Sequence, residues 1–352
     1  METRAAVCDV CKSVEGRLGQ IHQFGSSLDD LLGKMQDIKK SLKHSEKVLI
    51  GVSGGVDSSY VALAAGLVKL PVVLIHFDNG WNTQLAVHNI NSIVNSFNFE
   101  LHTVIQDWDT FKSLQRSFLF SGVPDIEVVS DHAIFSILLD FLNQRKDIRY
   151  VLSGGNFATE HGLDQRYVWS KWDQKNIRSI NANFDNTSLA KYPTASLWRW
   201  SYYRSLSRKQ KVLSPLNAVY YQRSYAVQQL SAQLGFVDYE FKHEESLITK
   251  VFQRTILPTK YNYYKIKDHL SALIRNKECS KPEALEALER FRSSKINEYE
   301  LEYFLDKLDL SRAAWDKILH DDPREHSHYK NSKLVFDAVT KVAGALKLRA
   351  MT

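Results

Sequence analysis

Cysteine is scarce in this chain, and long apolar stretches are missing from it. Three cysteines among 352 residues are too few for a disulfide framework, which favours folding in a reducing compartment. No run approaches the roughly 18 apolar residues that a membrane span requires. The first residues, Met1-Glu2-Thr3-Arg4, lack the apolar core of a secretory signal peptide. We therefore expect a cytoplasmic protein with no membrane-spanning segment.

The remaining composition is that of an ordinary globular protein with a small excess of positive charge. Hydrophobic residues make up 44% of the chain and charged residues 24%, and its length suits one large domain with an appendage or two domains. The net charge of +6 and the pI near 8.9 suit anionic ligands such as nucleotides, sugar phosphates or RNA. A mildly basic solvated surface would give the same values, so charge alone identifies no ligand.

Apolar runs typical of buried parallel strands alternate with helical patterns in the first half of the chain. We expect strands at residues 47–52, 71–78, 100–105 and, with the turn that follows it, 150–156. The helical patterns between them cover residues 60–67, 84–98 and 131–146. Strict alternation predicts an α/β fold, a parallel sheet with helices on both faces. Ligands of such sheets bind at the carboxyl ends of the strands.

Composition and hydrophobic pattern divide the chain into three parts. Residues 1–45 form an N-terminal extension with an amphipathic helix at 26–44, and residues 46–225 form the α/β domain. Residues 226–352 form a mostly helical region. Apolar residues recur there at helical spacing over 226–234, 245–256, 265–276, 282–292, 298–308, 311–319 and 333–347.

A glycine-rich turn, Ser53-Gly54-Gly55-Val56-Asp57-Ser58, joins the first predicted strand to the first predicted helix. It lacks the Lys-Ser/Thr pair of a Walker A loop and the three spaced glycines of a dinucleotide fingerprint. Gly54 and Gly55 can adopt positive φ, so that successive N–H groups point into one concavity at a helix N-terminus. Ser53 and Ser58 add hydroxyl donors, and the nest has the shape of a pyrophosphate. Asp57 suits such a site only through a cation, which predicts bound Mg²⁺.

These six residues resemble the PP-loop of the N-type ATP pyrophosphatases, which include the synthetase parts of GMP and NAD synthetases, asparagine synthetase and several RNA-thiolating enzymes. The resemblance implies that the loop binds the β,γ-pyrophosphate of ATP while a substrate oxygen attacks the α-phosphorus. A nitrogen or sulfur nucleophile then displaces AMP. Catalysis of this kind depends on positioning and charge neutralisation rather than on a nucleophilic side chain.

Other polar residues follow the predicted strands at the same edge of the sheet. Asp78 ends the second strand, where relatives contact adenosine, and Gly154-Gly155-Asn156 end the fourth strand and could close over the nucleotide. Glu160 is a candidate second carboxylate for Mg²⁺. Asp131 and His132 begin a helix directed at this edge and are candidate substrate contacts, although an Asp at a helix start is as often only a cap.

Three further stretches resemble one branch of the superfamily, the N-acetyl sugar amidotransferases of bacterial lipopolysaccharide and O-antigen biosynthesis. The first is His76-Phe77-Asp78-Asn79-Gly80-Trp81-Asn82. The second combines residues 129–134 with Ser153-Gly154-Gly155-Asn156-Phe157-Ala158-Thr159-Glu160. The third runs from Lys242-His243-Glu244-Glu245-Ser246 through residues 256–260 to residues 268–274. The resemblance spans residues 46 to about 320.

This resemblance implies that ATP activates the acetamido oxygen of a nucleotide-linked N-acetyl sugar and that ammonia displaces AMP, giving an acetamidino sugar. It further implies a separate glutaminase subunit that supplies ammonia, and in some members a cyclase-like protein between the two. Lys242 and His243 are the candidate catalytic residues of the helical region. Arg254, Lys260 and His269 are candidate substrate contacts, each of which could equally be an ordinary residue of a solvated helix face.

Cys8 and Cys11 have the spacing of a zinc-binding pair, but they supply two of the four ligands that a structural zinc needs. His22 and Cys279 could complete such a site. A Zn²⁺ site and an unused pair are both compatible with the sequence.

Two other functions compete with sugar amidination. A PP-loop tRNA-thiolating enzyme would suit the basic charge, but such enzymes usually carry cysteines close to the loop. A subunit that binds nucleotide only to regulate an assembly would have no need for Asp57 and Glu160. The segment Trp198-Arg199-Trp200-Ser201-Tyr202-Tyr203-Arg204 could stack on a nucleobase or bind RNA, or it could pack at a domain junction. We expect no nucleic-acid partner.

Overall fold

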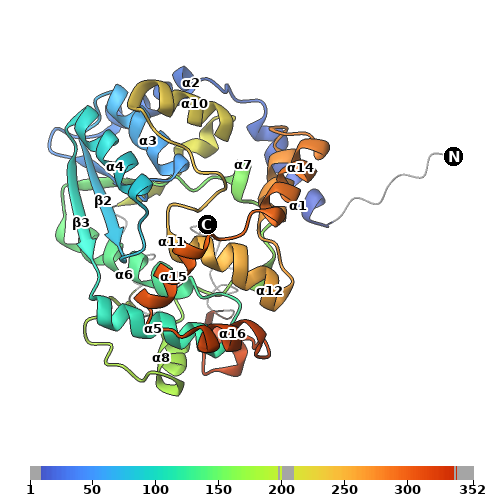
Figure 1. Ribbon diagram of the computed structural model, residues 1–352. Coiled ribbons are helices and arrows are strands. Elements are labelled where there is room, and N and C mark those ends of the chain that lie inside the picture. Colours follow the sequence, from blue (N-terminus) through green and yellow to red (C-terminus); the bar gives the residue numbers. More distant parts are fainter. Residues whose placement is uncertain (1–8, 197–198, 200–209, 337, 339–352) are drawn as a thin grey trace.

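The computed structural model describes residues 9–196, 199, 210–336 and 338 of the chain. A five-stranded sheet lies at its centre, with the strand order β3-β2-β1-β4-β5 and every neighbouring pair parallel (Figure 1). The strands are β1 (Lys47–Gly51), β2 (Val72–Asp78), β3 (Glu100–Ile105), β4 (Ile148–Leu152) and β5 (Lys211–Leu213). The first four confirm the predicted strands. The fifth, only three residues long, was not predicted.

Helices cover both faces of the sheet, as predicted. One face carries α3 (Val56–Leu67), which packs against α2 (Leu28–Ser41), α4 (Gln84–Phe97) and α10 (Arg223–Leu234). The opposite face carries α6 (Val128–Gln144). Successive residues of β1 divide between the two sides, because side chains of a strand alternate: Val48 and Ile50 face α3, whereas Leu49 packs with Ile137 of α6.

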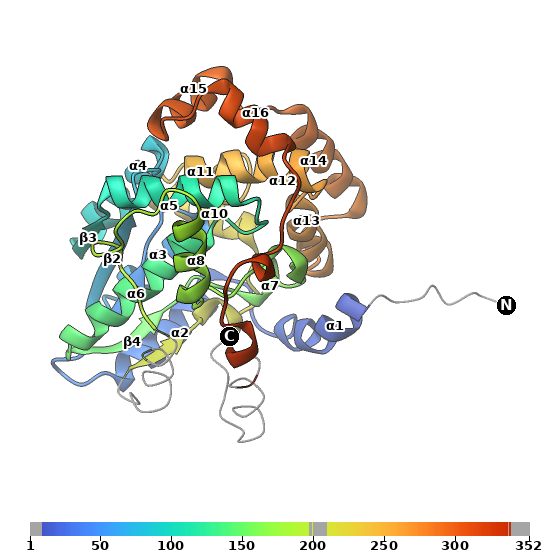
Figure 2. The same cartoon turned by 90° about the horizontal axis from the view of Figure 1, so that it is seen from below.

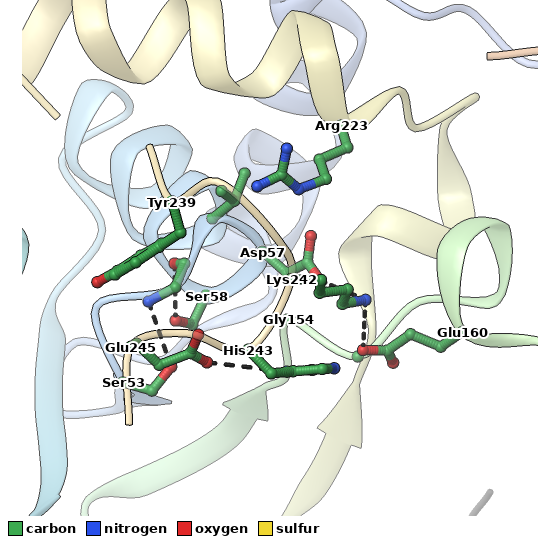
Figure 3. Close-up of a pocket in the computed structure, with 13 residues that line it drawn as sticks. Ser53, Asp57, Ser58, Gly154, Glu160, Arg223, Tyr239, Lys242, His243 and Glu245 are labelled. Atoms are coloured by element: carbon green, nitrogen blue, oxygen red, sulfur yellow. Dashed lines mark hydrogen bonds and ion pairs between the residues drawn. The ribbon is translucent and has the colours of Figure 1, made fainter. Parts of the chain in front are cut away.

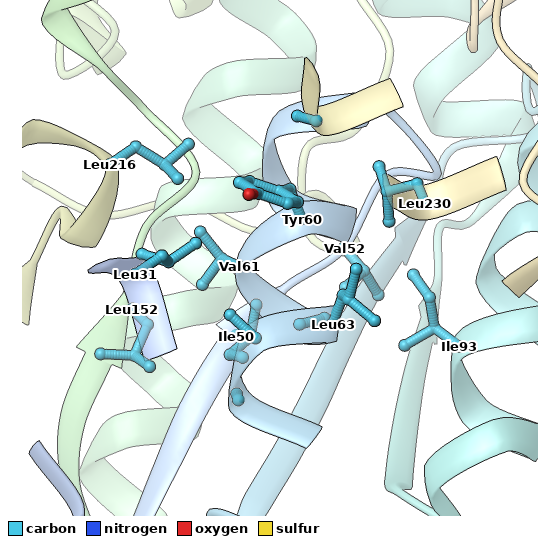
Figure 4. Packing of buried hydrophobic residues seen from close by; sticks show 14 of the residues in the cluster. Leu31, Ile50, Val52, Tyr60, Val61, Leu63, Ile93, Leu152, Leu216 and Leu230 are labelled. Carbon is cyan, nitrogen blue, oxygen red and sulfur yellow. The ribbon is translucent and has the colours of Figure 1, made fainter. Parts of the chain in front are cut away.

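The core on the α3 side holds the glycine-rich turn in place. Figure 4 shows Val61 and Leu63 of α3 beside Ile50 of β1. All three side chains are fully buried, and replacing one such leucine by alanine typically costs about 2–5 kcal/mol of stability. The same cluster extends along the chain to Phe236 and Tyr239, beyond the predicted end of the α/β domain at residue 225. The turn between β1 and α3 is therefore anchored at both ends by tightly packed elements.

The remaining helices form a second core beside the carboxyl ends of the strands. It joins α5 (Trp108–Ser121) and α8 (Gln174–Asn183) to helices from the C-terminal part of the chain. These are α11 (Leu247–Val251), a π-helical turn η3 (Phe252–Ile256), α12 (Leu257–Tyr261), α15 (Glu298–Lys307) and α16 (Arg312–His320). A smaller cluster links α13 (Ile266–Arg275) to α14 (Lys281–Ser293). Figure 2 shows α15, α16, α13 and α14 grouped on one side of the molecule.

The predicted helices agree with the structure within a few residues at each end where the chain is described. Within the described ranges, the longer helices α1 (Asp9–Ile21), α5 and α8 and the short helices α7 (Phe157–Glu160) and α12 were not predicted. The predicted helix at 333–347 lies largely outside the described residues. No helix in the described ranges is long and apolar enough to cross a membrane.

Candidate active site

A small cavity of about 190 Å³ opens at the carboxyl ends of β1 and β4 (Figure 3). This volume is below the 300–1,000 Å³ typical of pockets that enclose a whole drug-sized ligand, so it matches one part of a ligand, such as a diphosphate. The cavity is lined by Ser53, Gly55, Val56, Asp57, Ser58, Gly154, Gly155, Glu160, Arg223, Tyr239, Lys242, His243 and Glu245. The structure thus brings the predicted loop together with Glu160, Lys242 and His243.

The glycine-rich turn leaves the start of α3 open to an anion. Gly55 is the N-cap of α3, and no described side chain caps the helix there, whereas Ser27 caps α2 and Thr83 caps α4. The N–H groups of an uncapped first turn attract negative charge. Ser53 lies beside this helix start, and its Oγ accepts a hydrogen bond from the Gly55 N–H at 3.3 Å.

Two glycines allow the loops around the cavity to approach each other closely. Gly54 has φ +81°, and a Cβ there would lie 2.6 Å from the carbonyl oxygen of Ala86. A Cβ on Gly154 would lie 2.6 Å from the backbone nitrogen of Ser58. The loop after β4 therefore presses directly against the start of α3, and a larger residue at Gly154 would separate these two walls of the cavity, whereas a larger residue at Gly54 would push the turn away from α4.

Asp57 is held between a phenol and an ammonium group. Tyr221 donates a hydrogen bond from its hydroxyl to Asp57 Oδ1, and Lys242 Nζ lies 3.3 Å from Oδ2. Burial by itself raises the pKa of the Asp57 carboxyl, but Lys242, the Tyr221 hydrogen bond and Arg223 outweigh burial and keep the pKa below its usual value. Asp57 is therefore an anion at neutral pH. Tyr221 is fully buried, and no sequence motif indicated it.

Lys242 joins the two carboxylates that the sequence assigned to a metal. Its Nζ lies 3.0 Å from Glu160 Oε1 and donates to Thr159 Oγ1 at 3.1 Å, in addition to its contact with Asp57. Burial lowers the pKa of Lys242, but the two carboxylates more than offset burial and raise it. Two carboxylates within reach of one cation also fit Mg²⁺, which prefers oxygen ligands and binds with substrate phosphates. The residues present therefore fit the predicted metal.

The segment 242–246 is fixed to the loop that follows β2. An isolated bridge pairs Asn82 with Ser246, and the Thr83 N–H donates to the Glu245 carbonyl oxygen at 3.0 Å. His243 has φ +69°, an unusual conformation for a residue with a side chain, and its Nδ1 lies 3.8 Å from Glu245 Oε1. These main-chain contacts hold His243 and Glu245 at the mouth of the cavity.

Arg223, Tyr239 and Glu245 line the cavity but were not predicted as site residues. Arg223 comes from the first turn of α10 and forms a paired contact with Asp238 at 2.6 and 3.1 Å. Tyr239 donates its hydroxyl to the Gly54 carbonyl oxygen at 3.1 Å. Glu245 belongs to the Lys-His-x-Glu-Ser stretch that carried the family resemblance, which is the only signal that could have indicated it.

Asp78 and Asn156 are near the cavity but do not line it. Asp78 Oδ1 accepts hydrogen bonds from the Gly80 N–H at 2.9 Å and from Asn82 Nδ2 at 3.1 Å. Asn156 is the N-cap of α7 (Phe157–Glu160), and its Oδ1 accepts from the Thr159 N–H and hydroxyl. Asn156 thereby stabilises the start of the helix that carries Glu160, and Asp78 stabilises the loop after β2.

Asp131 and His132 lie on α6 and contact a different loop. Asp131 Oδ2 lies 3.0 Å from Lys171 Nζ. The His132 ring is fully buried. Its Nε2 accepts from the Ala195 N–H at 3.3 Å, so Nδ1 carries the proton donated to the Lys171 carbonyl oxygen at 2.8 Å. The described contacts give His132 a structural role in this state.

Arg254 and Lys260 also make contacts within the protein. Arg254 is 4% exposed, and it donates to Glu244 at 2.5 Å, to Glu240 at 3.0 Å and to Ser294 Oγ at 2.8 Å. Lys260 Nζ donates to two carbonyl oxygens at the end of α16, those of Ile318 and Asp321. The structure places neither residue at the cavity.

His269 lies closer to the cavity. It is buried on α13, and its ring centre lies 5.3 Å from that of His243. The structure therefore connects His269 to the cavity through His243.

Cys8, the first residue of the predicted zinc-binding pair, lies outside the described residues. Cys11 lies on α1, and Cys279 lies between α13 and α14. Within the described ranges no three His, Cys, Asp or Glu side chains form a group that could hold a metal ion by themselves. Of the aromatic and basic segment 198–204, only Arg199 is described, and its guanidinium contacts Asp140.

The chain is similar to one protein family over part of its length and loosely similar to solved structures. No curated protein sequence matches the chain significantly. The NMN synthetase from Francisella tularensis is 12% identical, with a TM-score of 0.38 over 81% of this chain and 97% of that chain. The NH3-dependent NAD synthetase from Campylobacter jejuni is 17% identical, with a TM-score of 0.35 over 78% of this chain and 93% of that chain. These overlaps are too loose to assign an activity.

The sequence match falls in the C-terminal part of the chain. Residues 245–343 match the family model described as LPS biosynthesis protein WbpG-like, C-terminal domain. The matched stretch begins at Glu245, inside the segment that borders the cavity, and includes α11 to α16. Over this stretch, the chain is similar to the C-terminal domain of WbpG-like lipopolysaccharide-biosynthesis proteins.

Proposed function

We propose that this protein is an ATP-dependent enzyme of the PP-loop type, which activates an acceptor oxygen by adenylation and releases pyrophosphate and then AMP. The observation that carries the proposal is the cavity itself. The uncapped start of α3 faces Lys242, and Lys242 is bonded to the carboxylates of Asp57 and Glu160. N–H donors for an anion, the ammonium group of Lys242 and two carboxylates that could hold a metal thus meet at one cavity.

Each group has a distinct task in this proposal. The N–H groups at the start of α3 and the Ser53 and Ser58 hydroxyls bind the leaving pyrophosphate. Arg223 and Lys242 add positive charge where negative charge develops. Asp57 and Glu160 would hold Mg²⁺, which would neutralise phosphate charge when bound. We propose that Asp78, Gly155 and Asn156 contact the rest of the nucleotide.

We further propose that the acceptor is the acetamido group of a nucleotide-linked N-acetyl sugar, used for surface polysaccharide such as O-antigen. The support is the WbpG-like match over residues 245–343, which covers helices beside the cavity. The amide oxygen attacks the α-phosphorus and pyrophosphate leaves. Ammonia then forms a bond to the amide carbon, the bond from that carbon to oxygen breaks, and AMP leaves with the oxygen. The product is an acetamidino sugar.

The ammonia has to come from elsewhere, because no described cysteine lies at the cavity to serve as a glutaminase nucleophile. We propose that a separate glutaminase subunit supplies it, with or without a cyclase-like protein between the two. ATP and nucleotide sugars are cytoplasmic metabolites, so the reaction belongs in the cytoplasm.

The test combines purified protein with ATP, Mg²⁺, ammonium chloride and a UDP-linked diacetamido uronic acid. We expect AMP and pyrophosphate to form only when the sugar is present. Asp57→Asn should abolish this activity while circular dichroism remains that of the folded protein. Release of ADP, or AMP formation driven by tRNA in place of the sugar, would contradict the proposal, and the second result would favour an RNA-thiolating enzyme.

A further inference from the structure

His269 is a buried imidazole without a well-aligned hydrogen bond, and the main chain of Thr159 gives it only a weak polar contact. Its side chain is 8% exposed on α13, which packs against α7. Neither ring nitrogen has a hydrogen-bond partner among the described residues. Buried polar groups are almost always hydrogen-bonded, so an exception calls for a functional or structural reason. By contrast, both ring nitrogens of the buried His132 are engaged.

The neighbours of His269 place it directly behind the cavity. Its ring centre lies 5.3 Å from that of His243, with the two planes 58° apart. His243 lines the cavity, and in Figure 3 its ring lies between the Glu245 and Glu160 carboxylates in projection. The elements packed around the two histidines carry charged groups: Lys242 next to His243, Glu160 on α7, Lys265 at the start of α13 and Glu127 at the start of α6. Lys265 and Glu127 form an ion pair at 3.0 Å.

These surroundings keep His269 uncharged. Burial lowers the pKa of its ring well below the usual value, and His243, Lys242 and Lys265 lower it further by repulsion. A neutral imidazole has one nitrogen with a free lone pair, which can accept a hydrogen bond or a proton. Of the carboxylates at the cavity, Asp57 and Glu160 share the Lys242 ammonium, and Glu245 Oε1 lies 3.8 Å from His243 Nδ1.

The proposed reaction needs a proton acceptor at the cavity itself, and of the two imidazoles only His243 lines the cavity. When ammonia bonds to the activated amide carbon, its nitrogen carries a positive charge and must lose one proton before AMP can leave. The electron pair of that N–H bond then helps to expel AMP as the bond from carbon to oxygen breaks.

We propose that His243 accepts this proton and that His269 is the positioning residue that holds the His243 ring toward the cavity. This inference rests on the proposed function. His243 comes from the main-chain segment fixed to the loop after β2 and is close to Glu245, so a carboxylate flanks the base as in other imidazole bases oriented by a third group. His269 packs against its ring from inside the protein.

The experiment separates the two halves of the reaction in His243→Gln and His269→Gln. Adenylation is followed as sugar-dependent exchange of labelled pyrophosphate into ATP, with a UDP-linked diacetamido uronic acid as acceptor and no ammonia. Full turnover is followed with ammonium chloride and separately with hydroxylamine, whose adduct is more acidic and loses its proton to water more readily.

We expect pyrophosphate exchange to be nearly unchanged in both variants. The rate of turnover with ammonia should fall by about 10²–10⁴-fold in His243→Gln and by a smaller factor in His269→Gln. The rate with hydroxylamine should fall far less in both variants.

The matched control is His326→Gln. His326 is another buried histidine with one unpartnered ring nitrogen, but it stacks on Trp169 away from the cavity. The His326→Gln substitution should lower thermal stability without changing the ratio of the turnover rate with hydroxylamine to the rate with ammonia. Equal loss with both nucleophiles, or loss of pyrophosphate exchange in His243→Gln, would overturn the inference. If the wild-type protein shows no sugar-dependent exchange, the proposed function fails first and the inference fails with it.

Discussion

Lys242 Nζ lies 3.3 Å from Asp57 Oδ2, and both side chains are largely buried, at 14% and 16% exposure. Because the same ammonium also contacts Glu160, one lysine balances two carboxylates at the cavity. In the proposed function, a ligand phosphate would compete with those carboxylates for Lys242, and Asp57 and Glu160 would be the residues that hold Mg²⁺.

Lys242→Met should destabilise the ligand-free protein. Removing one partner leaves buried charge without compensation, which costs about 3–5 kcal/mol in comparable pairs, whereas Lys242→Arg should recover part of the loss. Urea denaturation measures the change in free energy of unfolding. Lys191→Met is the control, since Lys191 is 73% exposed in its pair with Asp107 and its loss should leave stability nearly unchanged. Equal stability of Lys242→Met and wild type would show that the contact contributes nothing.

Gly154→Ala should damage the cavity, and Gly51→Ala should not. A Cβ on Gly154 meets the backbone nitrogen of Ser58 at 2.6 Å, whereas a Cβ on Gly51 meets nothing within 4 Å. Overpacking of this kind costs about 1–3 kcal/mol, and it moves the Gly154 loop away from α3. Calorimetric titration with ATP and Mg²⁺ should show binding lost in Gly154→Ala and retained in Gly51→Ala. Normal binding by Gly154→Ala would mean that the close approach is not required.

The fold was predictable where one physical signal dominated. Strands β1, β2 and β4 are mainly apolar because they lie inside a parallel sheet, whereas β3 at the edge of the sheet mixes apolar and polar residues. The turn between β1 and α3 has a distinctive glycine pattern. Strand β5 escaped prediction because its three residues are partly exposed at the edge of the sheet and follow a stretch of polar and aromatic residues. Its position depends on pairing with β4, a contact that no local pattern encodes.

The site was predictable where a residue belonged to the turn or to a family-like stretch. Arg223 and Tyr221 reach the cavity through the packing of α10 on α3, and sequence spacing says nothing about such packing. Arg254 and Lys260 show the opposite case, in which the sequence predicted substrate contacts and the structure places the side chains in contacts within the protein. A basic residue in a family-like stretch can bind a ligand or hold the fold together, and only the tertiary contacts distinguish the two.

Arg254→Met should therefore lower stability and leave substrate binding unchanged. The variant leaves Glu244, whose side chain is 9% exposed, without its partner, and losses near 3 kcal/mol are typical. Thermal denaturation together with KM values for ATP and the sugar tests this expectation. Arg292→Met is the control, because its pair with Glu289 lies on the surface. A raised KM with an unchanged melting temperature would instead place Arg254 in the substrate site.

The Glu127–Lys265 pair should contribute to the acid sensitivity of the protein. Burial raises the pKa of Glu127, but Lys265 and Lys171 outweigh burial and lower it from 4.5 to about 2. The unfolded chain therefore binds more protons between these values, and stability decreases as the pH falls from about 5 toward 2.

Lys265→Met removes the main attraction, so its stability should fall less steeply over the same pH range. Urea midpoints measured from pH 7 to pH 3 give the two slopes. Lys267→Met, on the same helix and over the Tyr264 ring, should keep the wild-type slope. Identical slopes for wild type and Lys265→Met would exclude the pair as a source of acid sensitivity.

The bridge between Asn82 and Ser246 has an evolutionary consequence. It fixes the segment that carries Lys242 and His243 to the loop after β2, and a further hydrogen bond joins the Leu247 N–H to the Trp81 carbonyl oxygen at 2.9 Å. The helices that follow residue 247 can therefore accumulate substitutions, insertions or new contacts while the ATP-activating groups keep their positions. Under the proposed function, changes in these C-terminal helices would alter acceptor choice while Lys242 and His243 keep their positions.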